Sequence, residues 1–537
     1  MILDLLDKWF VAVERVGSSI ARRKRLAVAI CGLLVLVVRV AELPRMPVPV
    51  PLILDEFSHL LAADTFASGR LTNPQHTMWT RFESFHILQS PTYMSMYPPA
   101  QGMFLALGQK LAGIPWLGVL LGMTLCCAAM CWMLQGWFPP GWAFFGGLLI
   151  AMHVGVFTYW MNSYYGGGVA AFGGALMFGA LPRVMRRPNV RDALLLSLGL
   201  AILANSRPYE GLVAAIPVAG ALIYWLFRGP ESRYSTTPSK WSRVAVPIVA
   251  VMALTIAGIG YYNWRVTGDP KLFPQTLNRQ TYAVAPYFVW ESERPEPPYR
   301  HEVMRKFYTV LETGFEKADL QDLDGWLVSM RDRSLRVWGF YLGMVLTIPL
   351  LLLPLVLRDR KIRFWIWATP IFLVGVLLAR FTQAHYVAPM MSAIYVLLLQ
   401  CMRHLRCLDR GRSQAGLWTV RVIALIVFAV FAKNVVRAED GVGYNWRFDR
   451  ALLEDRLEHM PGLQLVMVRY GADHFIEQEW VYNRADIDHS KVVWAREMPN
   501  AADNVDLNAY FHDRMCWILE PDVDQLQLTP CPSLAVP

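Results

Sequence analysis

The sequence predicts a mainly α-helical membrane protein that crosses the bilayer many times and carries a small α/β domain at its carboxyl end. Of its 537 residues, 55% are hydrophobic and only 17% are charged, whereas soluble domains carry about 25% charged residues. Long apolar runs alternate with short clusters of Lys and Arg. The net charge of +9 therefore follows the positive-inside pattern of membrane proteins, and it does not indicate a surface that binds nucleic acid.

The first residues predict an amphipathic helix that lies on the membrane surface, which we assign to residues 1–24. Its apolar stripe recurs at a spacing of three to four residues and consists of Ile2, Leu6, Trp9, Val13, Val16 and Ile20. Acidic residues precede the first long apolar run, and no small-residue cleavage site is evident. These features are typical of an interfacial helix rather than of a signal peptide.

The region 25–435 predicts about eleven transmembrane helices. We place them at 27–40, 116–136, 141–160, 169–182, 192–205, a run ending at Arg228, 244–262, 336–357, a run ending near Arg380, 386–401 and 417–435. The loops on one side are basic, including 229–243 and His404–Arg412, which puts the amino terminus in the cytoplasm and the carboxyl terminus outside. Two large outer segments, 41–115 and 263–335, remain. The sequence holds no Asn-x-Ser/Thr sequon, and this absence favours a bacterial inner membrane over a secretory lumen.

The tail, residues 436–537, predicts a separate extracytoplasmic α/β unit. Three apolar runs (464–470, 492–496 and 517–519) read as buried strands, and three segments (450–459, 475–482 and 505–511) read as helices between them. This alternation predicts a small parallel sheet. Cys516 and Cys531 form a disulfide if the tail is exported, but the sequence alone leaves both states of these cysteines open.

The first outer segment begins with an acidic pair, Asp55-Glu56. The run from Glu56 predicts a helix that Gly69 ends. Asp55 is then either an ordinary N-cap, with Glu56 complementing the helix dipole, or a catalytic carboxylate. His59 shares the face of both acids and either pairs with them or binds substrate. Residues 76–86 give the segment a polar, aromatic surface that suits a sugar or simply packs the loop.

Three features together resemble the GT-C glycosyltransferases, particularly the aminoarabinose-transferase and protein O-mannosyltransferase-like branch. They are the first span, the outer loop with Asp-Glu at the start of a helix, and Tyr97-Pro98-Pro99 before an apolar helix. The resemblance covers about residues 25–270 well and the later spans loosely. It implies an inverting membrane enzyme that moves a sugar from a polyprenyl-phosphate donor to an extracytoplasmic lipid, glycan or protein. It also implies that Asp55 is the general base and that Glu56 orients it or binds sugar.

The predicted substrate-binding residues lie at the outer ends of the spans. A departing lipid phosphate needs positive charge nearby, and Arg207 either supplies that charge or anchors its span while paired with Glu210. His385 and Tyr386, together with Arg380, form a second outer cluster. Tyr97 and the prolines after it set the path by which the chain re-enters the membrane. The complete set of substrate-binding candidates is His59, Tyr97, Arg207, Glu210, Arg279, His385 and Tyr386.

The loop after the third predicted span departs from the family pattern. Many relatives carry a second acidic residue there, sometimes tied to a metal, whereas residues 160–168 of this chain contain no acid. Asn162 is the one neutral ligand that could replace it. We therefore expect an enzyme without a metal or other cofactor, whose partners are the membrane, the lipid-linked donor and the acceptor, and not a nucleic acid.

Two functions of other classes compete with the transferase. A flippase for lipid-linked sugars needs charged residues along a path through its spans, whereas the carboxylates of this chain gather in one outer loop. An inactive relative that scaffolds an envelope complex is the other alternative. An Asp55→Asn variant separates them, because an enzyme loses transfer and a scaffold keeps its function.

Overall fold

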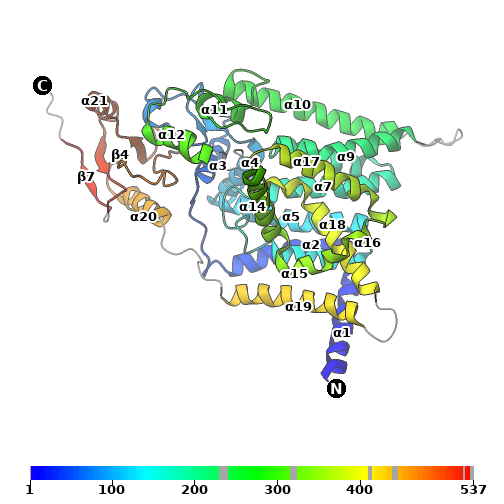
Figure 1. Ribbon diagram of the computed structural model, residues 1–537. Helices are drawn as coiled ribbons and strands as arrows, with labels where there is room; N and C mark the ends of the chain where they lie inside the picture. Colours follow the sequence, from blue (N-terminus) through cyan, green and yellow to red (C-terminus); the bar gives the residue numbers. More distant parts are fainter. Residues whose placement is uncertain are drawn as a thin grey trace.

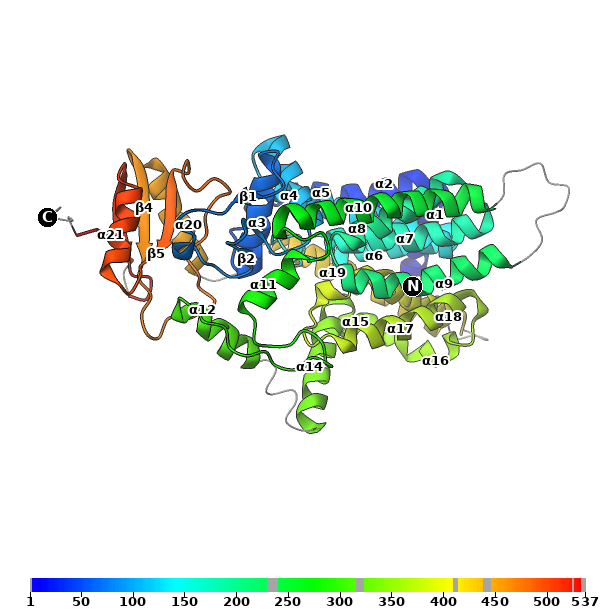
Figure 2. The same cartoon turned by 90° about the horizontal axis from the view of Figure 1, so that it is seen from above.

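The computed structural model describes residues 2–228, 240–314, 323–408, 414–437, 446–523 and 526–532. The basic residues 229–239 and 409–413, and the side chain of Ile2, lie outside the described residues, so the predictions that rest on them are not addressed below. The molecule is elongated (Figure 1), and Figure 2 shows the tail at one end, the helical bundle at the other, and short helices between them.

The bundle forms from the apolar runs that the sequence shows. Its helices are α2 (Lys24–Ala41), α5 (Trp116–Trp137), α6 (Pro140–His153), α7 (Gly168–Arg186), α8 (Val190–Ala204), α9 (Pro208–Phe227), α10 (Val246–Thr267), α17 (Arg363–Leu378), α18 (Met391–Cys407) and α19 (Ala415–Val436). Glycines allow close packing between them. A Cβ atom on Gly199 of α8 would lie 2.5 Å from the carbonyl oxygen of Gly173 on α7, so the two backbones touch as small residues permit in membranes.

Six helices in the described parts of the chain are long and apolar enough to cross a membrane, or seven if one bent pair counts as a span. This finding confirms a multi-pass membrane protein. Helices also occupy the other predicted spans, but α6, α8 and α18 have only 14, 15 and 17 residues, fewer than the roughly 20 that a bilayer needs. The count of eleven spans therefore stays a prediction.

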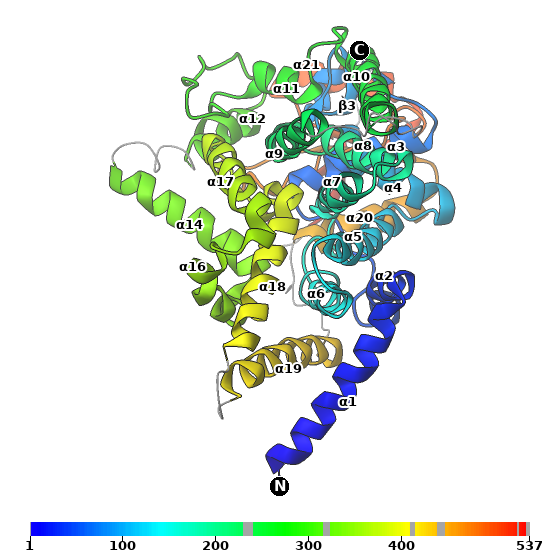
Figure 3. The same cartoon turned by 90° about the vertical axis from the view of Figure 1, so that its right-hand side faces the viewer.

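The predicted span 336–357 is wrong as a continuous helix. Its first residues belong to α14 (Leu323–Tyr341), which runs across the bundle direction and projects from it (Figure 3). The chain then bends by 96° into the short helices α15 (Gly343–Thr347) and α16 (Leu353–Val356). Gly343 takes the left-handed conformation at the bend, with φ = 58°, which glycine adopts without steric cost. Apolar composition alone does not report such a change of direction.

The amino-terminal helix α1 (Ile2–Arg22) forms as predicted. Trp9, Val13 and Val16 on its apolar stripe are exposed, and its placement on the membrane surface stays a prediction. Its acidic face is tied to the bundle, because Glu14 pairs with Arg421 of α19 at 3.1 Å. Glu14, which lies outside the apolar stripe, therefore attaches this helix to the helical bundle.

The first outer segment folds into two helices and a small sheet. Helix α3 (Leu54–Ala67) ends before Gly69, where φ is 77°, as the sequence predicts. Three short antiparallel strands follow in the order β1-β3-β2, with β1 at Asn73–Pro74, β2 at Ile87–Leu88 and β3 at Thr92–Ser95. Helix α4 (Pro99–Ala112) starts with Pro99 in its first turn. The sequence missed these strands because two to four residues are too few to show an alternating pattern.

The tail contains the predicted parallel strands. They are β4 (Leu463–Val468), β5 (Val492–Arg496) and β6 (Arg514–Leu519). A fourth strand, β7 (Leu528–Pro530), pairs antiparallel with β6, so the sheet order is β5-β4-β6-β7. Helices α20 (Trp446–His459) and α21 (Ala501–Tyr510) flank the sheet. The helix predicted at 475–482 is wrong. That segment is irregular, and Glu479 within it is buried in an ion pair with Arg496 of β5.

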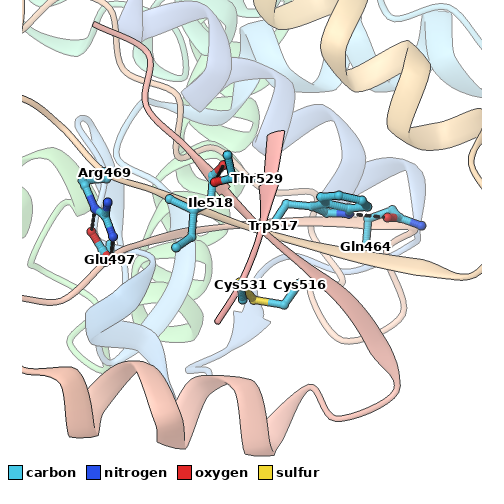
Figure 4. The surroundings of a disulfide bond; sticks show 8 residues. All are labelled: Gln464, Arg469, Glu497, Cys516, Trp517, Ile518, Thr529 and Cys531. Carbon is cyan, nitrogen blue, oxygen red and sulfur yellow. Dashed lines mark hydrogen bonds and ion pairs between the residues drawn. A yellow bond between two sulfur atoms is a disulfide. The ribbon is translucent and has the colours of Figure 1, made fainter. Parts of the chain in front are cut away.

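A disulfide joins Cys516 of β6 to Cys531 just beyond β7, with Cα atoms 5.4 Å apart (Figure 4). On the same strand, the indole of Trp517 donates a hydrogen bond of 2.8 Å to Gln464 of β4. The sequence left the state of these two cysteines open, and the structure contains the disulfide. The bond joins β6 to the chain that follows the edge strand β7. The boundaries of the three predicted domains stay predictions.

The tail packs directly on the first outer segment. The rings of Phe57 on α3 and Tyr482 in the tail stack at 4.1 Å and are almost parallel. The carboxylate of Asp64, on the same helix, accepts a hydrogen bond of 2.8 Å from the backbone N–H of Ala485. Tyr93 of β3 donates another, of 2.9 Å, to the carbonyl of Asn483. Helix α3 is therefore held from the outside by the tail.

Candidate active site

A cavity of about 1260 Å³ lies beside α3 on the side toward the bundle. Its walls come from the starts of α3, α4 and α9, the loop after α6, the second outer segment, the loop between α17 and α18, and two pieces of the tail. All but one of the predicted site residues line it: Asp55, His59, Tyr97, Arg207, Glu210, Arg279, His385 and Tyr386. The fold thus brings together residues that are far apart in the sequence.

Asp55 lies in the first turn of α3 and faces the cavity. The N-cap of this helix is Ile53, so the alternative in which Asp55 caps the helix is wrong. Its Oδ1 accepts a hydrogen bond from the hydroxyl of Tyr97, and Nδ1 of His86 lies 3.7 Å from the same oxygen. No described residue hydrogen-bonds to Oδ2. One carboxylate oxygen is therefore fixed, and the other is available to a ligand.

Glu56 is the predicted site residue that does not line the cavity. Adjacent residues on a helix point about 100° apart, and Glu56 turns into the protein, where its side chain is buried. Its Oε1 accepts a hydrogen bond of 3.4 Å from the backbone N–H of Leu52. Burial raises the pKa of Glu56 to about 8, against the effect of backbone N–H groups at Leu52, Ile53 and Tyr164. The two neighbouring carboxyls thus lie in different surroundings, Asp55 at the cavity and Glu56 buried in the protein.

Two histidines in the wall, His59 and His385, have lowered pKa values and are neutral at pH 7. Burial lowers the pKa of His59 to about 3, and its ring stacks on Tyr97 at 4.6 Å. Burial and the charge of Arg207 lower the pKa of His385 well below its usual range, and Nδ1 of His385 lies 3.0 Å from the hydroxyl of Tyr159. Neither histidine supplies positive charge, so arginines are the cations of this site.

Arg207 is positioned by the loop between α8 and α9 and precedes the first residue of α9. Its guanidinium lies over the ring of Tyr386 at 4.2 Å. It forms no ion pair with a carboxylate of the described chain. The charge of Glu210, one turn further on, favours the charged form of Arg207 without direct contact. A cation held by an aromatic face and exposed to a cavity is arranged to receive an anion.

Arg279, in the second outer segment on helix α11 (Pro274–Tyr282), is different. Its guanidinium pairs with Glu312 at 2.8 Å and also donates to the carbonyl of Ala285. Although it lines the cavity, its hydrogen-bonding groups already have protein partners. It is therefore a weaker candidate for ligand binding than Arg207.

Other residues of the wall were not among the predicted ones. On α14, the side chains that line the cavity are Ser329, Asp332, Arg333, Arg336 and Phe340. Their spacing of three, one, three and four residues defines one face of a helix, and Leu327, Val328 and Leu335 elsewhere on α14 are exposed. This periodicity is visible in the sequence. It was missed because the region was assigned to a loop and a span.

The polar surface predicted at 76–86 is mostly used for packing. His86 lines the cavity, but His76 pairs with Asp488 of the tail at 3.0 Å, and Glu83 is buried against the hydroxyl of Tyr282 at 2.9 Å. His86 itself has φ = 59°, which non-glycine residues seldom adopt outside functional sites. Sequence patterns carry no signal for such a backbone.

Asn162 does not line the cavity, and its side chain is hydrogen-bonded within the protein. Its Oδ1 accepts a hydrogen bond of 3.0 Å from Arg39 of α2, and its amide nitrogen donates to the carbonyls of Val156 and Thr158. Within the described ranges, no three His, Cys, Asp or Glu side chains form a group that could hold a metal ion. Metal independence itself stays a prediction.

No protein-family model matches the chain, and no curated relative matches it. Solved structures are similar. ArnT from Cupriavidus metallidurans bound to undecaprenyl phosphate is 12% identical, with a TM-score of 0.50 and 92% of each chain covered. The apo state of that protein is 13% identical, with a TM-score of 0.49 and the same coverage. The archaeal oligosaccharyltransferase AglB from Archaeoglobus fulgidus is 12% identical, in its complex with an inhibitory peptide and a dolichol-phosphate. Its TM-score is 0.48, and the match covers 92% of this chain and 69% of AglB.

The likeness to ArnT bound to undecaprenyl phosphate shows the fold. The chain has the fold of that protein, which agrees with the resemblance found in the sequence. At 12% identity it shows the fold alone, so the chemistry has to be argued from the cavity.

Proposed function

We propose that this protein is a membrane glycosyltransferase that moves a sugar from a polyprenyl-phosphate donor to an extracytoplasmic lipid, glycan or protein acceptor. The observation that supports the proposal most is the shared cavity, where the carboxylate of Asp55 and the guanidinium of Arg207 are both present. Transfer from a lipid phosphate requires a base for the acceptor and positive charge for the leaving group. These two side chains supply both.

In the proposed reaction, an acceptor hydroxyl or amine attacks the anomeric carbon while the bond from this carbon to the phosphate oxygen breaks. The acceptor proton passes to Oδ2 of Asp55, because Oδ1 is held by Tyr97. The polyprenyl phosphate leaves with the bonding electrons, and Arg207 stabilises its charge. A single displacement of this kind inverts the anomeric centre.

Glu56 has a supporting role in this proposal. Its carboxyl holds the backbone at Leu52, where the chain enters α3, and so orients the turn that carries Asp55. Its raised pKa of about 8 means that it is protonated at pH 7. A protonated Glu56 adds no negative charge beside Asp55.

The proposed setting is a bacterial inner membrane with the cavity and tail outside and the amino terminus in the cytoplasm. The tail and α3 lie at the same end of the molecule (Figure 2). Helix α7 ends with Arg183 and Arg186, and α18 ends with Arg406. These basic ends agree with cytoplasmic loops under the positive-inside rule, and the eleven predicted spans give the same orientation.

The test is transfer by the Asp55→Asn variant in membranes. Loss of a general base lowers the rate by about 10²- to 10⁴-fold, and the variant should still fold, since Asp55 is not the helix cap. A flippase would still move the lipid-linked sugar across the membrane without transferring it, and a scaffold would keep its complex. Normal transfer by this variant would show that Asp55 is not the base.

The proposed reaction uses no metal. Washing the enzyme with a chelator should therefore leave the transfer rate unchanged. A rate that disappears in chelator and returns with manganese or magnesium would contradict this part of the proposal.

A further inference from the structure

The tail contributes a short loop, Phe475–Gln478, to the cavity wall, and we call this loop the lip. Trp446, Phe475, Glu477 and Gln478 line the cavity and all belong to the tail. Phe475 is 59% exposed although it is a large apolar residue, and Glu477 is exposed as well. In the described chain, neither the carboxylate of Glu477 nor the amide of Gln478 forms a side-chain hydrogen bond or ion pair. The lip therefore presents unoccupied binding groups to the cavity.

The residues on both sides of the lip are firmly held. His474 is buried, and its Nδ1 lies 2.7 Å from Asp522. Glu479 is fully buried and pairs with Arg496. Between these two anchors, the N–H of Gln478 donates a hydrogen bond of 2.9 Å to the carbonyl of Phe475, which forms a turn. A loop that is rigid before its ligand arrives binds at a smaller entropic cost.

The chemistry of the lip suits a sugar ring. One face of a pyranose presents C–H groups, which pack on the electron-rich face of an aromatic ring, and its edge carries hydroxyl groups. A carboxylate accepts hydrogen bonds from such hydroxyls, and an amide both donates and accepts them. Phe475, Glu477 and Gln478 provide these three functions within one turn of chain.

A peptide acceptor fits this wall poorly. One way in which extended peptides bind is by adding a strand to an open sheet edge, and β5 is an edge strand of the tail's sheet. Asn483 blocks this edge, because its side chain accepts a hydrogen bond from the N–H of Trp494 and donates one to its carbonyl, both at 2.8 Å. At Trp494, in the middle of β5, the backbone groups that an added strand needs are therefore already used.

We infer that the lip Phe475–Gln478 binds the acceptor, and that the acceptor is a carbohydrate, free or as the head group of a glycolipid. This inference rests on the proposed function and specifies its acceptor. Arg207 would act on the donor phosphate, and the tail would present the acceptor hydroxyl to Asp55.

The experiment is a binding assay of the full, detergent-solubilised chain on an array of bacterial envelope glycans and on an array of acceptor-type peptides. We expect glycan binding that falls at least about tenfold in Phe475→Ala and Glu477→Gln. The matched control is Asp473→Asn, which removes an exposed carboxylate four residues away that does not line the cavity; it should bind as the unchanged chain does.

Binding to the peptides instead, binding to neither array, or equal glycan binding by all variants would overturn the inference. The Asp55→Asn variant keeps the two proposals apart, because it should lose transfer and retain glycan binding. If it retains transfer while the lip variants lose glycan binding, the proposed catalytic role fails and the acceptor site stands.

Discussion

Arg496 in the tail and Arg207 in the cavity wall are the same side chain in opposite surroundings. Arg496 pairs with Glu479, which is fully buried, and also donates 2.7 Å to the carbonyl of Glu83 in the first outer segment. Arg207 rests on the ring of Tyr386 and has no ion pair with a described carboxylate. The first arginine joins two parts of the fold, and the second is left available to a ligand.

This difference separates stability from function. A buried charge that is paired with a carboxylate in the protein holds the tail against the outer segment, and its loss should unfold the region without any chemical effect of its own. A charge in a cavity that has no carboxylate partner costs stability, and we expect it to be retained for an anion. Substitutions at the two sites should therefore affect different measurements.

The largest effect is expected for Glu479→Gln, which leaves Arg496 as a buried charge without its partner. Breaking a buried pair in this way costs about 3–5 kcal/mol, measurable by thermal or denaturant unfolding. Glu497→Gln is the control, because it breaks the more exposed pair with Arg469, and exposed pairs contribute only about 0–1 kcal/mol. Equal losses for the two variants would contradict the comparison.

For Arg207→Gln we expect the reverse pattern. The melting temperature should change little, since no described carboxylate pairs with this arginine, while transfer should fall by about 10²- to 10³-fold through loss of charge stabilisation. Transfer rates and melting curves from the same preparation test this. A variant that unfolds but keeps its rate per folded molecule would assign Arg207 to the fold.

A smaller effect concerns the pH dependence of stability at Glu56. Its folded-state pKa of about 8 lies above the ordinary value of 4.5, so the folded state binds more protons than the unfolded state between these values. Stability from this group is present below pH 4.5 and decreases as the pH rises to 8, by at most about 1.4 kcal/mol per pH unit. Glu56→Gln imitates the protonated form, so it should remove this decrease and retain transfer at pH 7.

Unfolding curves at pH 5, 7 and 9 measure the effect. The variant should match the unchanged chain at pH 5 and exceed it at pH 9. A Glu56→Gln protein that is less stable at pH 9 would mean that the carboxyl is ionised in the folded state.

The smallest effect is expected at the rim of the cavity, for Arg336→Gln on α14. A basic residue near a membrane surface contributes about 1 kcal/mol to the binding of anionic lipid, so the KM for the donor should rise about fivefold with kcat unchanged. Arg331→Gln is the control, because Arg331 pairs with Asp332 and does not line the cavity. A similar rise in both variants would indicate a general effect of charge.

Much of the fold was predictable because long apolar runs in the sequence indicate membrane helices. The helix after Asp55 and its end at Gly69 followed from local signals, and Arg207 and His385 were found because they stand at the outer ends of spans. The bend at Gly343 was not predictable, since the apolar run continues through it. The different fates of Asp55 and Glu56 depend on which side of α3 meets the tail, which is set by contacts such as Phe57 on Tyr482 that no local pattern contains.

Arg207 has no carboxylate partner in the described chain, and in our proposal it binds the phosphate of a lipid carrier. The most direct measurement is a titration of the purified full chain with undecaprenyl phosphate, comparing the unchanged protein, Arg207→Gln and Asp55→Asn. We predict that Arg207→Gln raises the Kd at least about tenfold, whereas Asp55→Asn binds as tightly as the unchanged protein. Equal affinity for all three would contradict the claim.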